Sequence, residues 1–592
     1  MLPTLGYAAG LYLCLACALL AAWGAGSRGL RCIGADRPDE AGGPATAVVV
    51  GTGLYICLFQ VLAIAGWFRA APVLLSLGVG LLVGAHEAWR SRRRQAPPAR
   101  LAWTLGEGAA FCLMLAVALP TFIRPLGVPL VWDELMYHLP HARLWAQEGT
   151  LAIHEWLRYP RFPYNVDLLF AACLLLGSDV ATHLVSASAG WLAACIIYRL
   201  GVRYLDRITA CIATAFWFVL TISEYNRAYV DMPVALFTVA ALAGFLRWQE
   251  LRACQEQAAR GWLAASAFCM GIAVGSKYQA LMVLPLFAVS LVRHDRRPST
   301  WAWVLSALLL PAGYWYARNA WQTGDPFSPI GGRIFGFHDW NAEDLRLQFE
   351  DLRRHAAWPE PWLVAAVWVP FFPALRQRAG VRAAIVAAAY LVATWAVSSR
   401  YPRYLMVAYP LLSLLAAAGW MEALRLIARR VSRSRRPPRG LPGRPAIALV
   451  LVTIVAVVLA AATKTQLFQR IASTHDEREA VLTARVTGYP VLAWLREHPS
   501  GKVYQMGLEE TLYYAPARTH GDGFGPWRYR DYIGLEPQAL HQALRRQDFD
   551  ALLIHTGRMP NVTSKPGFDR WFHLMFAHEG VALYRLDTAP AP

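Results

Sequence analysis

The sequence predicts a mostly α-helical membrane protein followed by a small C-terminal α/β domain. Hydrophobic residues make up 56% of the 592 residues, and the mean hydropathy is +0.32. Apolar runs of about 15 to 22 residues, close to the length that crosses a bilayer, recur along the chain as far as Ala461. Sustained polar character begins only after these runs. We therefore expect a polytopic membrane domain over residues 1–465 and a soluble α/β domain over residues 466–592.

Hydropathy places about fourteen transmembrane helices in the first domain. They cover residues 4–24, 46–66, 71–87, 101–120, 179–200, 208–223, 232–247, 262–275, 279–292, 301–317, 361–375, 383–398, 404–425 and 445–463. The apolar stretch Val166–Leu176 is too short to cross about 30 Å of hydrocarbon. For that stretch we expect an interfacial or re-entrant helix.

The distribution of arginine indicates which loops face the cytoplasm. The formal net charge is +18, and arginines cluster between apolar runs at Arg90–Arg100, Arg293–Arg297 and Arg429–Arg444. This is the positive-inside pattern, so the charge does not indicate a nucleic-acid partner. With these loops inside, alternation places loops 121–165 and 318–360 on the external face, together with both termini and the C-terminal domain.

The segment Val131–Pro140, with the sequence VWDELMYHLP, follows an apolar span and combines several reactive side chains. It sets two adjacent carboxylates, Asp133 and Glu134, beside Tyr137 and His138. Ionisable groups so close to a membrane commonly belong to a functional site. For the carboxylate pair, the structural alternatives are a solvated loop end and a helix cap.

Further ionisable residues at span ends gather on the same external face. They are His141 in the first loop, Glu224, Arg227 and Asp231 before the seventh span, Lys277, Arg318, and Arg400 with Arg403. A carboxylate can take a proton from an attacking hydroxyl, whereas lysine and arginine bind phosphate. The set therefore favours transfer of a group away from a phosphate.

Several of these charges also have a structural alternative. Lys277 can extend its amine to the headgroups, and Arg400 and Arg403 can anchor a helix at the interface. Asp231 precedes Met-Pro at a helix start and can act as an N-cap.

The sequence gives little support for metal, nucleotide or zinc-protease sites. His138 and His141 are either a metal pair or, more simply, capping and orienting residues. The sequence contains no GxGxxG, GxxxxGK[ST] or HExxH motif. Nucleotide-driven and zinc-protease functions therefore lose their main support.

Several motifs occur in order: DELMYHLP, RFPYN, EYNRAYVDMPVALF, GIAVGSKYQAL, WYARNAWQTGDPFSP and SSRYPRYLMVAYPLL. Together they resemble the polytopic GT-C superfamily of glycosyltransferases over most of residues 101–590. The similarity is greatest to bacterial relatives of protein O-mannosyltransferase and of the lipid A aminoarabinose transferase, the family 39 type. Residues 1–100 have no counterpart among these motifs. The WWD-type motif of oligosaccharyltransferases is also missing, which weakens an assignment as an en bloc glycan transferase.

The resemblance implies a GT-C fold in a bacterial inner membrane, with the active site on the periplasmic face. The donor would be a sugar on polyprenyl phosphate, and its transfer to an extracytoplasmic lipid, glycan or protein would invert the anomeric carbon. Asp133 would be the general base, and Glu134 would hold a metal or position the acceptor. The phosphate-binding candidates are Lys277, Arg318, Arg400 and Arg403, and the substrate-binding candidates are Tyr137, His138, Glu224, Arg227, Asp231 and Tyr278. No cofactor is firmly implied, and a requirement for a divalent metal is left open.

Two other functions compete with this interpretation. A transporter or flippase of lipid-linked sugars would also have many spans, but transporters place ionisable groups near the bilayer midplane. The groups here lie at span ends on one face, which favours chemistry over passage. A polymerase or ligase of lipid-linked glycans shares the donor chemistry and differs mainly in the size of the donor.

The C-terminal segment alternates helical and strand patterns. Helices are expected at Tyr489–Glu497 and Pro537–Arg546, and strands at Lys502–Met506, Asp550–Ile554 and Val581–Leu586. The resulting domain would cover the catalytic cleft, bind acceptor, or only stabilise the long loops. Its aromatic residues Tyr513, Tyr514, Phe524, Trp527 and Tyr529 would stack on sugar rings or simply pack.

Overall fold

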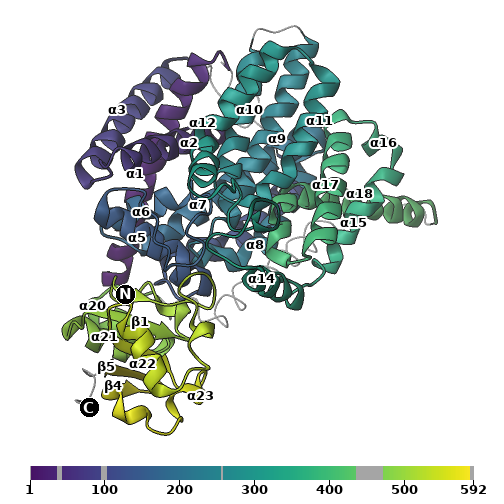
Figure 1. Cartoon of the computed structure of the whole chain (residues 1–592). Coiled ribbons are helices and arrows are strands. Elements are labelled where there is room, and N and C mark those ends of the chain that lie inside the picture. The colour runs from purple at the N-terminus through teal and green to yellow at the C-terminus, as the bar shows by residue number, and fades with distance from the viewer. Residues whose placement is uncertain (1, 36–42, 95–102, 255–257, 435–470, 587–592) are drawn as a thin grey trace.

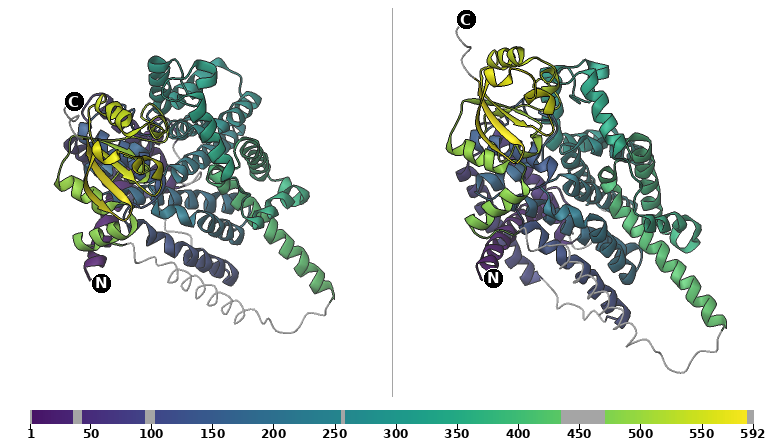
Figure 2. Two further views of the ribbon diagram at one scale, coloured as in Figure 1. Left: turned by 60° about the horizontal axis from the view of Figure 1, so that its bottom comes forward. Right: turned by 90° about the horizontal axis from the view of Figure 1, so that it is seen from below.

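A computed structural model describes residues 2–35, 43–94, 103–254, 258–434 and 471–586 of the chain (Figure 1). The helices of the first domain are α1 (Leu2–Cys32), α2 (Pro44–Ile64), α3 (Ala70–Arg94), α4 (Leu105–Ala118), α5 (Leu139–Glu148), α6 (Asp167–Leu175), α7 (Val180–Tyr204), α8 (Arg207–Thr221), α9 (Asp231–Ala253), α10 (Ala259–Val274), α11 (Leu284–His294), α12 (Pro298–Thr323), α13 (Gly332–Phe335), α14 (Ala342–Arg354), α15 (Ala365–Trp368), α16 (Pro373–Arg376), α17 (Ala379–Ser398) and α18 (Tyr409–Ser434). Short 3-10 turns join several of them, among them η5 (Tyr278–Val283) and η8 (Pro402–Ala408). Figure 2 shows α18 projecting past the other helices at its far end.

Within the described ranges, nine helices are long and apolar enough to cross a membrane. They coincide with predicted spans, as do the shorter apolar helices over residues 259–274, 278–294 and 361–371. The predicted span 301–317 lies inside α12, and the span 445–463 lies outside the described residues. The predicted class, a mostly helical polytopic protein with a small C-terminal sheet domain, is confirmed, whereas the predicted number of spans is not.

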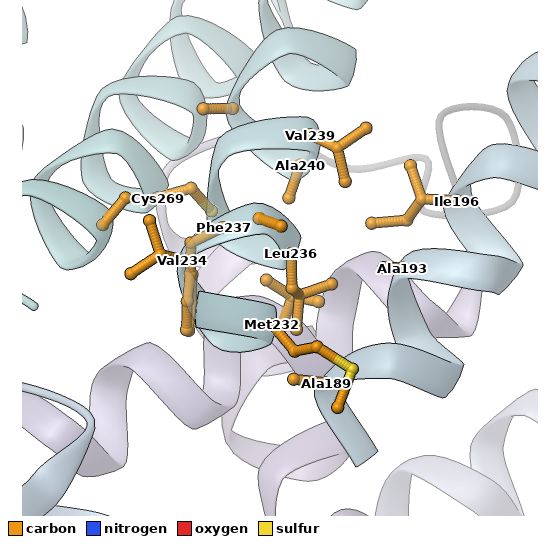
Figure 3. Packing of buried hydrophobic residues seen from close by; sticks show 14 of the residues in the cluster. Ala189, Ala193, Ile196, Met232, Val234, Leu236, Phe237, Val239, Ala240 and Cys269 are labelled. Atoms are coloured by element: carbon orange, nitrogen blue, oxygen red, sulfur yellow. The ribbon is translucent and has the colours of Figure 1, made fainter. Parts of the chain in front are cut away.

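The centre of the bundle forms around α9, which is apolar on all sides and buried along nearly its whole length. Such a helix has no face suited to water or to charged neighbours, so the other helices surround it. Figure 3 shows Met232, Leu236 and Val239 of α9 among small and branched side chains of α7 and α10. Small residues on these neighbours allow the close approach of helix backbones that is common in membranes.

The predicted interfacial segment forms the nine-residue helix α6, which packs against α5 and α7. At 1.5 Å per residue this helix is about 14 Å long, well short of a bilayer. The prediction that residues 166–176 do not cross is consistent with this length.

The C-terminal domain contains a five-stranded sheet in the order β2-β1-β3-β5-β4. The strands are β1 (Lys502–Met506), β2 (Thr519–His520), β3 (Phe549–His555), β4 (Phe572–His578) and β5 (Val581–Leu586), and the helices are α20 (His475–Arg485), α21 (Tyr489–Glu497), α22 (Pro537–Arg545) and α23 (Pro560–Thr563). β1 pairs in parallel with β2 and β3, whereas β5 pairs antiparallel with β3 and β4. The predicted helices and strands are present, but α20 and the edge strands β2 and β4 were not predicted. The proposed domain boundary at residue 466 lies outside the described residues.

The C-terminal domain covers one end of the helical bundle, beside the N-terminal end of α1 and close to α14 (Figures 1 and 2). Arg143 of α5 donates to the carbonyls of Tyr513 and Ala515 at 2.5 and 3.0 Å, which fixes the domain on the first loop. Arg528 joins the domain to Asp344 of α14 at 2.6 Å. These contacts bring loops of both domains to one place.

Candidate functional site

A cavity of about 1190 Å³ lies between the helical bundle and the C-terminal domain. Four parts of the chain line it: the first loop with Asp133, Tyr137, His138, Arg158 and Tyr159, the span ends with Arg227, Lys277, Tyr278, Arg403 and Tyr404, the predicted external loop with Trp340, Glu350 and Asp351, and the C-terminal domain with Glu509, Phe524 and Tyr529. This volume is somewhat larger than that of most small-molecule sites in proteins. The cavity therefore has room for a sugar phosphate and a second substrate together.

Four charged groups alternate in sign along one side of this cavity. Arg403 Nη2 donates to Asp133 Oδ2 at 2.6 Å, and Arg403 Nε lies 3.6 Å from Asp231 Oδ2. Lys277 Nζ donates to Asp231 Oδ1 at 2.8 Å. The side chains of Asp133 and Arg403 are 18% and 16% exposed, so both remain accessible from the cavity. Two cations and one accessible carboxylate thus stand together in the cavity wall.

Asp133 lies outside the membrane-spanning helices, in a site where burial and neighbouring charges act in opposite directions. Burial raises its pKa, but the guanidinium of Arg403 and other nearby positive charges together lower it by more, so the pKa of Asp133 lies below the ordinary value. Asp133 is therefore a carboxylate at neutral pH. A charged carboxylate accepts protons and hydrogen bonds but donates none.

One π-helical turn, Glu134–His138, follows Asp133 directly and leads into α5. Such turns insert an extra residue into a helix and frequently occur at functional sites. Here Tyr137 and His138 face the cavity together with Asp133, while Glu134 is buried away from it. The local backbone thus separates the two adjacent carboxylates.

Because Glu134 does not line the cavity, its placement disfavours the predicted role as a metal ligand or acceptor contact. One of its oxygens accepts from the backbone N–H groups of Leu130 and Val131, both at 2.6 Å. The other accepts from the N–H of Ala228 at 2.7 Å and lies 2.9 Å from His183 Nε2. The geometry makes Glu134 a positioning residue that holds the first loop against α7 and the start of α9.

Replacing Glu134 with alanine is expected to destabilise the protein strongly. The change leaves several backbone N–H groups without their acceptor, and each buried unsatisfied donor costs about 1 to 3 kcal/mol. We expect a marked fall in the thermal unfolding temperature of the detergent-solubilised protein. Glu350→Ala is the matched control, because Glu350 lines the cavity and is partly exposed. Equal unfolding temperatures for the two variants would contradict this role of Glu134.

The structure brings further predicted residues to the cavity. Arg227 and Tyr278 line it, whereas Asp231 is buried behind it and contacts the lining residues Lys277 and Arg403. The Tyr278 hydroxyl donates to the carbonyl of Ser328 at 3.0 Å, which orients the ring. These side chains stay candidates for substrate contacts.

Besides Glu134 and Asp231, three further predicted residues do not line the cavity. Glu224 is buried and pairs with Arg227 at 2.9 Å. Arg318 packs over Trp315, and Arg400 is exposed with its guanidinium over a tryptophan ring. The predicted phosphate contacts of Arg318 and Arg400 therefore find no support in the geometry, because their charges are directed elsewhere.

The proposed histidine pair separates in the structure. His141 is buried, and its Nε2 lies 3.1 Å from the carbonyl of Arg158. His138 Nδ1 instead lies 2.6 Å from Asp167 Oδ1, which orients the imidazole ring. In the ranges that the structure describes, no group of three or more His, Cys, Asp and Glu side chains is arranged to hold a metal ion.

Sequence reasoning missed aromatic residues that surround the charges. The ring centroid of Tyr404 lies 5.1 Å from Lys277 Nζ, and that of Tyr229 lies 4.6 Å from the Arg403 guanidinium. The Tyr229 hydroxyl also accepts from the Asp133 backbone N–H at 3.2 Å. Both tyrosines belong to the motifs quoted above. Their positions next to candidate charged residues were the sequence feature that could have identified them as site residues. Glu509 of the C-terminal domain, by contrast, belongs to none of these motifs, and no feature of the sequence indicated that it lies in the site.

Two family models match separate parts of the chain. The model described as dolichyl-phosphate-mannose-protein mannosyltransferase matches residues 163–315, and the model described as SF2091/S2213 matches residues 477–585. An uncharacterized protein of Shigella flexneri, SF2092/S2214, is 49% identical over 53 residues, which are 9% of this chain and 29% of that protein. A second one, SF2093/S2215, is 29% identical over 130 residues, which are 21% of this chain and 64% of that protein. The chain thus spans less than two thirds of either relative.

Among solved structures, ArnT from Cupriavidus metallidurans bound to undecaprenyl phosphate superposes with a TM-score of 0.50. The identity is 15%, and the match covers 81% of this chain and 98% of that one. The archaeal oligosaccharyltransferase AglB from Archaeoglobus fulgidus superposes with a TM-score of 0.48 at 12% identity, over 83% of this chain and 75% of that one. Residues 163–315 are similar to the mannosyltransferase family. The ArnT match shows that the chain shares the fold of that protein, and the long apolar helices make it an integral membrane protein with an ArnT-like GT-C fold.

Proposed function

We propose that this protein is a membrane glycosyltransferase that moves one monosaccharide from a polyprenyl-phosphate carrier to an acceptor hydroxyl. The reaction would take place on the external face of a bacterial inner membrane. The observation that carries the proposal is the accessible Asp133 carboxylate, which lies beside the cations Arg403 and Lys277 in one cavity. The mannosyltransferase family match includes Lys277, and the solved ArnT structure of this fold holds undecaprenyl phosphate.

The proposed reaction needs one base and one site for a leaving phosphate. The acceptor oxygen forms a bond to the anomeric carbon while the bond from that carbon to the phosphate oxygen breaks. The acceptor proton passes to Asp133, and the carrier leaves as polyprenyl phosphate with its negative charge facing Arg403 and Lys277. Attack from the side opposite the phosphate inverts the anomeric carbon. Fixed cations in a partly dry cavity stabilise the developing phosphate charge more than water does.

Arg403 has a second effect in this scheme, because it holds the base before substrate arrives. A carboxylate paired with a guanidinium is a weak base. A donor phosphate would compete with Asp133 for the guanidinium of Arg403, which lies 2.6 Å from the carboxylate. Donor binding would thus release Asp133 and raise its basicity before the acceptor reacts.

The pH dependence of transfer should reflect this pairing. The base works only when Asp133 is deprotonated, so kcat/KM is retained above its pKa and is lost as the pH falls through it. Burial raises the pKa of Asp133, but Arg403 and the other nearby cations lower it by more. The acid limb of the wild-type profile is therefore expected at a lower pH than the pKa of an ordinary aspartate. In Arg403→Ala, burial acts without the strongest opposing charge, and the acid limb of the residual activity should move to higher pH. An unchanged acid limb in this variant would exclude Asp133 as the titrating base.

The proposal is tested by supplying purified wild-type protein with radiolabelled polyprenyl-phosphate monosaccharides and a membrane extract as the acceptor source. We expect one donor of the panel to lose its sugar to a component of the extract, with release of polyprenyl phosphate. If no donor is consumed while the protein is folded and binds undecaprenyl phosphate, the glycosyltransferase proposal fails. That result would favour transport of a lipid-linked sugar.

A further inference from the structure

The C-terminal domain turns one particular edge of its sheet towards the cavity. Strands β2, β1 and β3 run parallel to one another. The cavity-lining residues that follow them in the chain are Gly507 and Glu509 after β1, Gly523 and Phe524 after β2, and Arg558 and Met559 after β3. In open α/β sheets, ligands bind in the crevice outside the carboxyl ends of parallel strands. The domain therefore presents its expected ligand-binding edge to the proposed active site. A domain that only covered the cleft would not need this orientation.

This edge is held firmly against the first loop and the segment before α14. Two nitrogens of Arg158 donate to the carboxylate of Asp522, directly before Gly523: Nε lies 2.8 and 3.1 Å from its two oxygens, and Nη2 bonds to Oδ1. Trp340 stacks on Phe524 with the ring centroids 5.4 Å apart. Bidentate pairs between arginine and carboxylate fix orientation as well as distance. The loop after β2 is thus placed on the same cavity as the segment that carries the proposed base.

Three hydrogen-bonding groups of different kinds converge at Gly523. A Cβ added there would lie 3.2 Å from the Tyr529 hydroxyl and 3.3 Å from both Arg158 Nη2 and Glu509 Oε1. A guanidinium donates, a carboxylate accepts and a phenol does both. The Tyr529 hydroxyl donates to Glu509 Oε1 at 2.7 Å, and the absence of a side chain at Gly523 leaves these groups around one point of the cavity wall. We call Arg158, Glu509, Gly523 and Tyr529 the polar cradle.

An apolar surface stands next to the polar cradle. The Phe524 ring is half-buried and lines the cavity, and the guanidiniums of Arg158 and Arg530 lie 4.6 and 5.3 Å from its centroid. Other aromatic residues of this stretch serve the fold. Tyr513 and Tyr514 bond to backbone groups of the first loop, and Trp527 packs against the core of the domain.

We propose that the polar cradle and the Phe524 surface form the acceptor subsite, and that the acceptor unit bound there is a saccharide. A sugar ring carries neighbouring hydroxyls, which both donate and accept hydrogen bonds, and a C–H face, which packs on apolar groups. The polar cradle meets the first requirement and Phe524 the second. The inference rests on the proposed function, because it takes this cavity to be the place where donor and acceptor meet.

Saturation-transfer difference NMR on the full-length protein in lipid nanodiscs tests this inference, with undecaprenyl phosphate present to fill the donor side. The probes are the methyl glycosides of glucose, mannose, N-acetylglucosamine and glucuronic acid, and a serine- and threonine-rich peptide. We expect at least one glycoside to receive saturation and the peptide to receive none. Binding of the peptide alone would assign the edge to a protein acceptor, and absence of any glycoside signal would also overturn the inference.

Matched glycine variants then locate the binding site. Gly523→Ala places a methyl group among the polar atoms of the cradle, and the loss of one hydrogen bond there should weaken glycoside binding by about tenfold. Gly534→Ala is the control, because Gly534 lies in the same domain and a Cβ there would meet no atom of the described residues within 4 Å. Equal glycoside affinities for the two variants would exclude the polar cradle.

A second pair of variants separates the apolar contact from folding. Phe524→Leu should weaken glycoside binding, whereas Phe576→Leu should not, because Phe576 is also half-buried but stacks on Trp494 away from the cavity. Binding of undecaprenyl phosphate, followed by native mass spectrometry, should be retained in Gly523→Ala and strongly weakened in Arg403→Ala. If the wild-type protein binds the lipid but no glycoside, only the acceptor inference is overturned, whereas a folded wild-type protein that binds glycoside but no lipid overturns the proposed donor.

Discussion

Asp133→Asn is expected to abolish sugar transfer, with a loss in kcat of about 10²- to 10⁴-fold, because the amide cannot take the acceptor proton. The substitution keeps the size of the side chain and one oxygen acceptor, so the fold should survive it. The measurement is release of labelled sugar from the active donor of the panel, with the unfolding temperature recorded for both proteins. Donor binding should change less than turnover, because Arg403 and Lys277 remain.

The matched control for this prediction is Asp351→Asn. Asp351 also lines the cavity but is exposed and lies on α14, away from the alternating charges. We expect it to retain nearly full activity. Full transfer by a stable Asp133→Asn protein would show that another group acts as the base, and loss of activity in both variants would point to a general electrostatic effect.

Arg403→Ala is expected to cause the second large loss, about 10²- to 10³-fold in transfer, through weaker stabilisation of the departing phosphate. Arg403 contacts both Asp133 and Asp231, so its removal also leaves two carboxylates with one cation, Lys277. We therefore expect some loss of thermal stability as well. The decisive measurement is affinity for undecaprenyl phosphate, which should fall far more than affinity for the acceptor.

Arg400→Ala provides the control, since Arg400 lies three positions earlier in the same motif but is exposed and does not line the cavity. It should bind undecaprenyl phosphate as the wild type does. Similar losses in both variants would favour anchoring at the interface over phosphate binding. Equal effects of Arg403→Ala on donor and acceptor would indicate a structural role.

The membrane architecture was largely predictable because each apolar helix must satisfy its own backbone hydrogen bonds and exclude charge. That constraint acts locally, so the long helices appear in the sequence as apolar runs. Apolar runs do not predict short or broken helices. Residues 361–371, for example, form several short turns where the sequence predicted one span. The edge strand β4 was missed for a related reason: several of its residues are exposed, and only pairing with β5 makes it a strand.

The charged centre of the site was predicted in part. Asp133, Lys277 and Arg403 stand out because charge at the end of an apolar run is rare. The family resemblance named Asp133 as the base, but the role of Glu134 was left open, because only the π-helical turn shows that the two adjacent side chains lie in different directions. The same limit applies to Arg400, which has the same charge and motif as Arg403 but points elsewhere.

The sequence alone thus determined the class of protein, the positions of most membrane helices and the motifs from which the catalytic candidates come. These properties depend on composition and on contacts between near neighbours. Only the tertiary structure decided that Arg403 bonds to Asp133 across 270 positions, and that loops after three parallel strands complete the cavity. Such contacts arise from the packing of distant segments, and no local pattern of residues records which surfaces will meet.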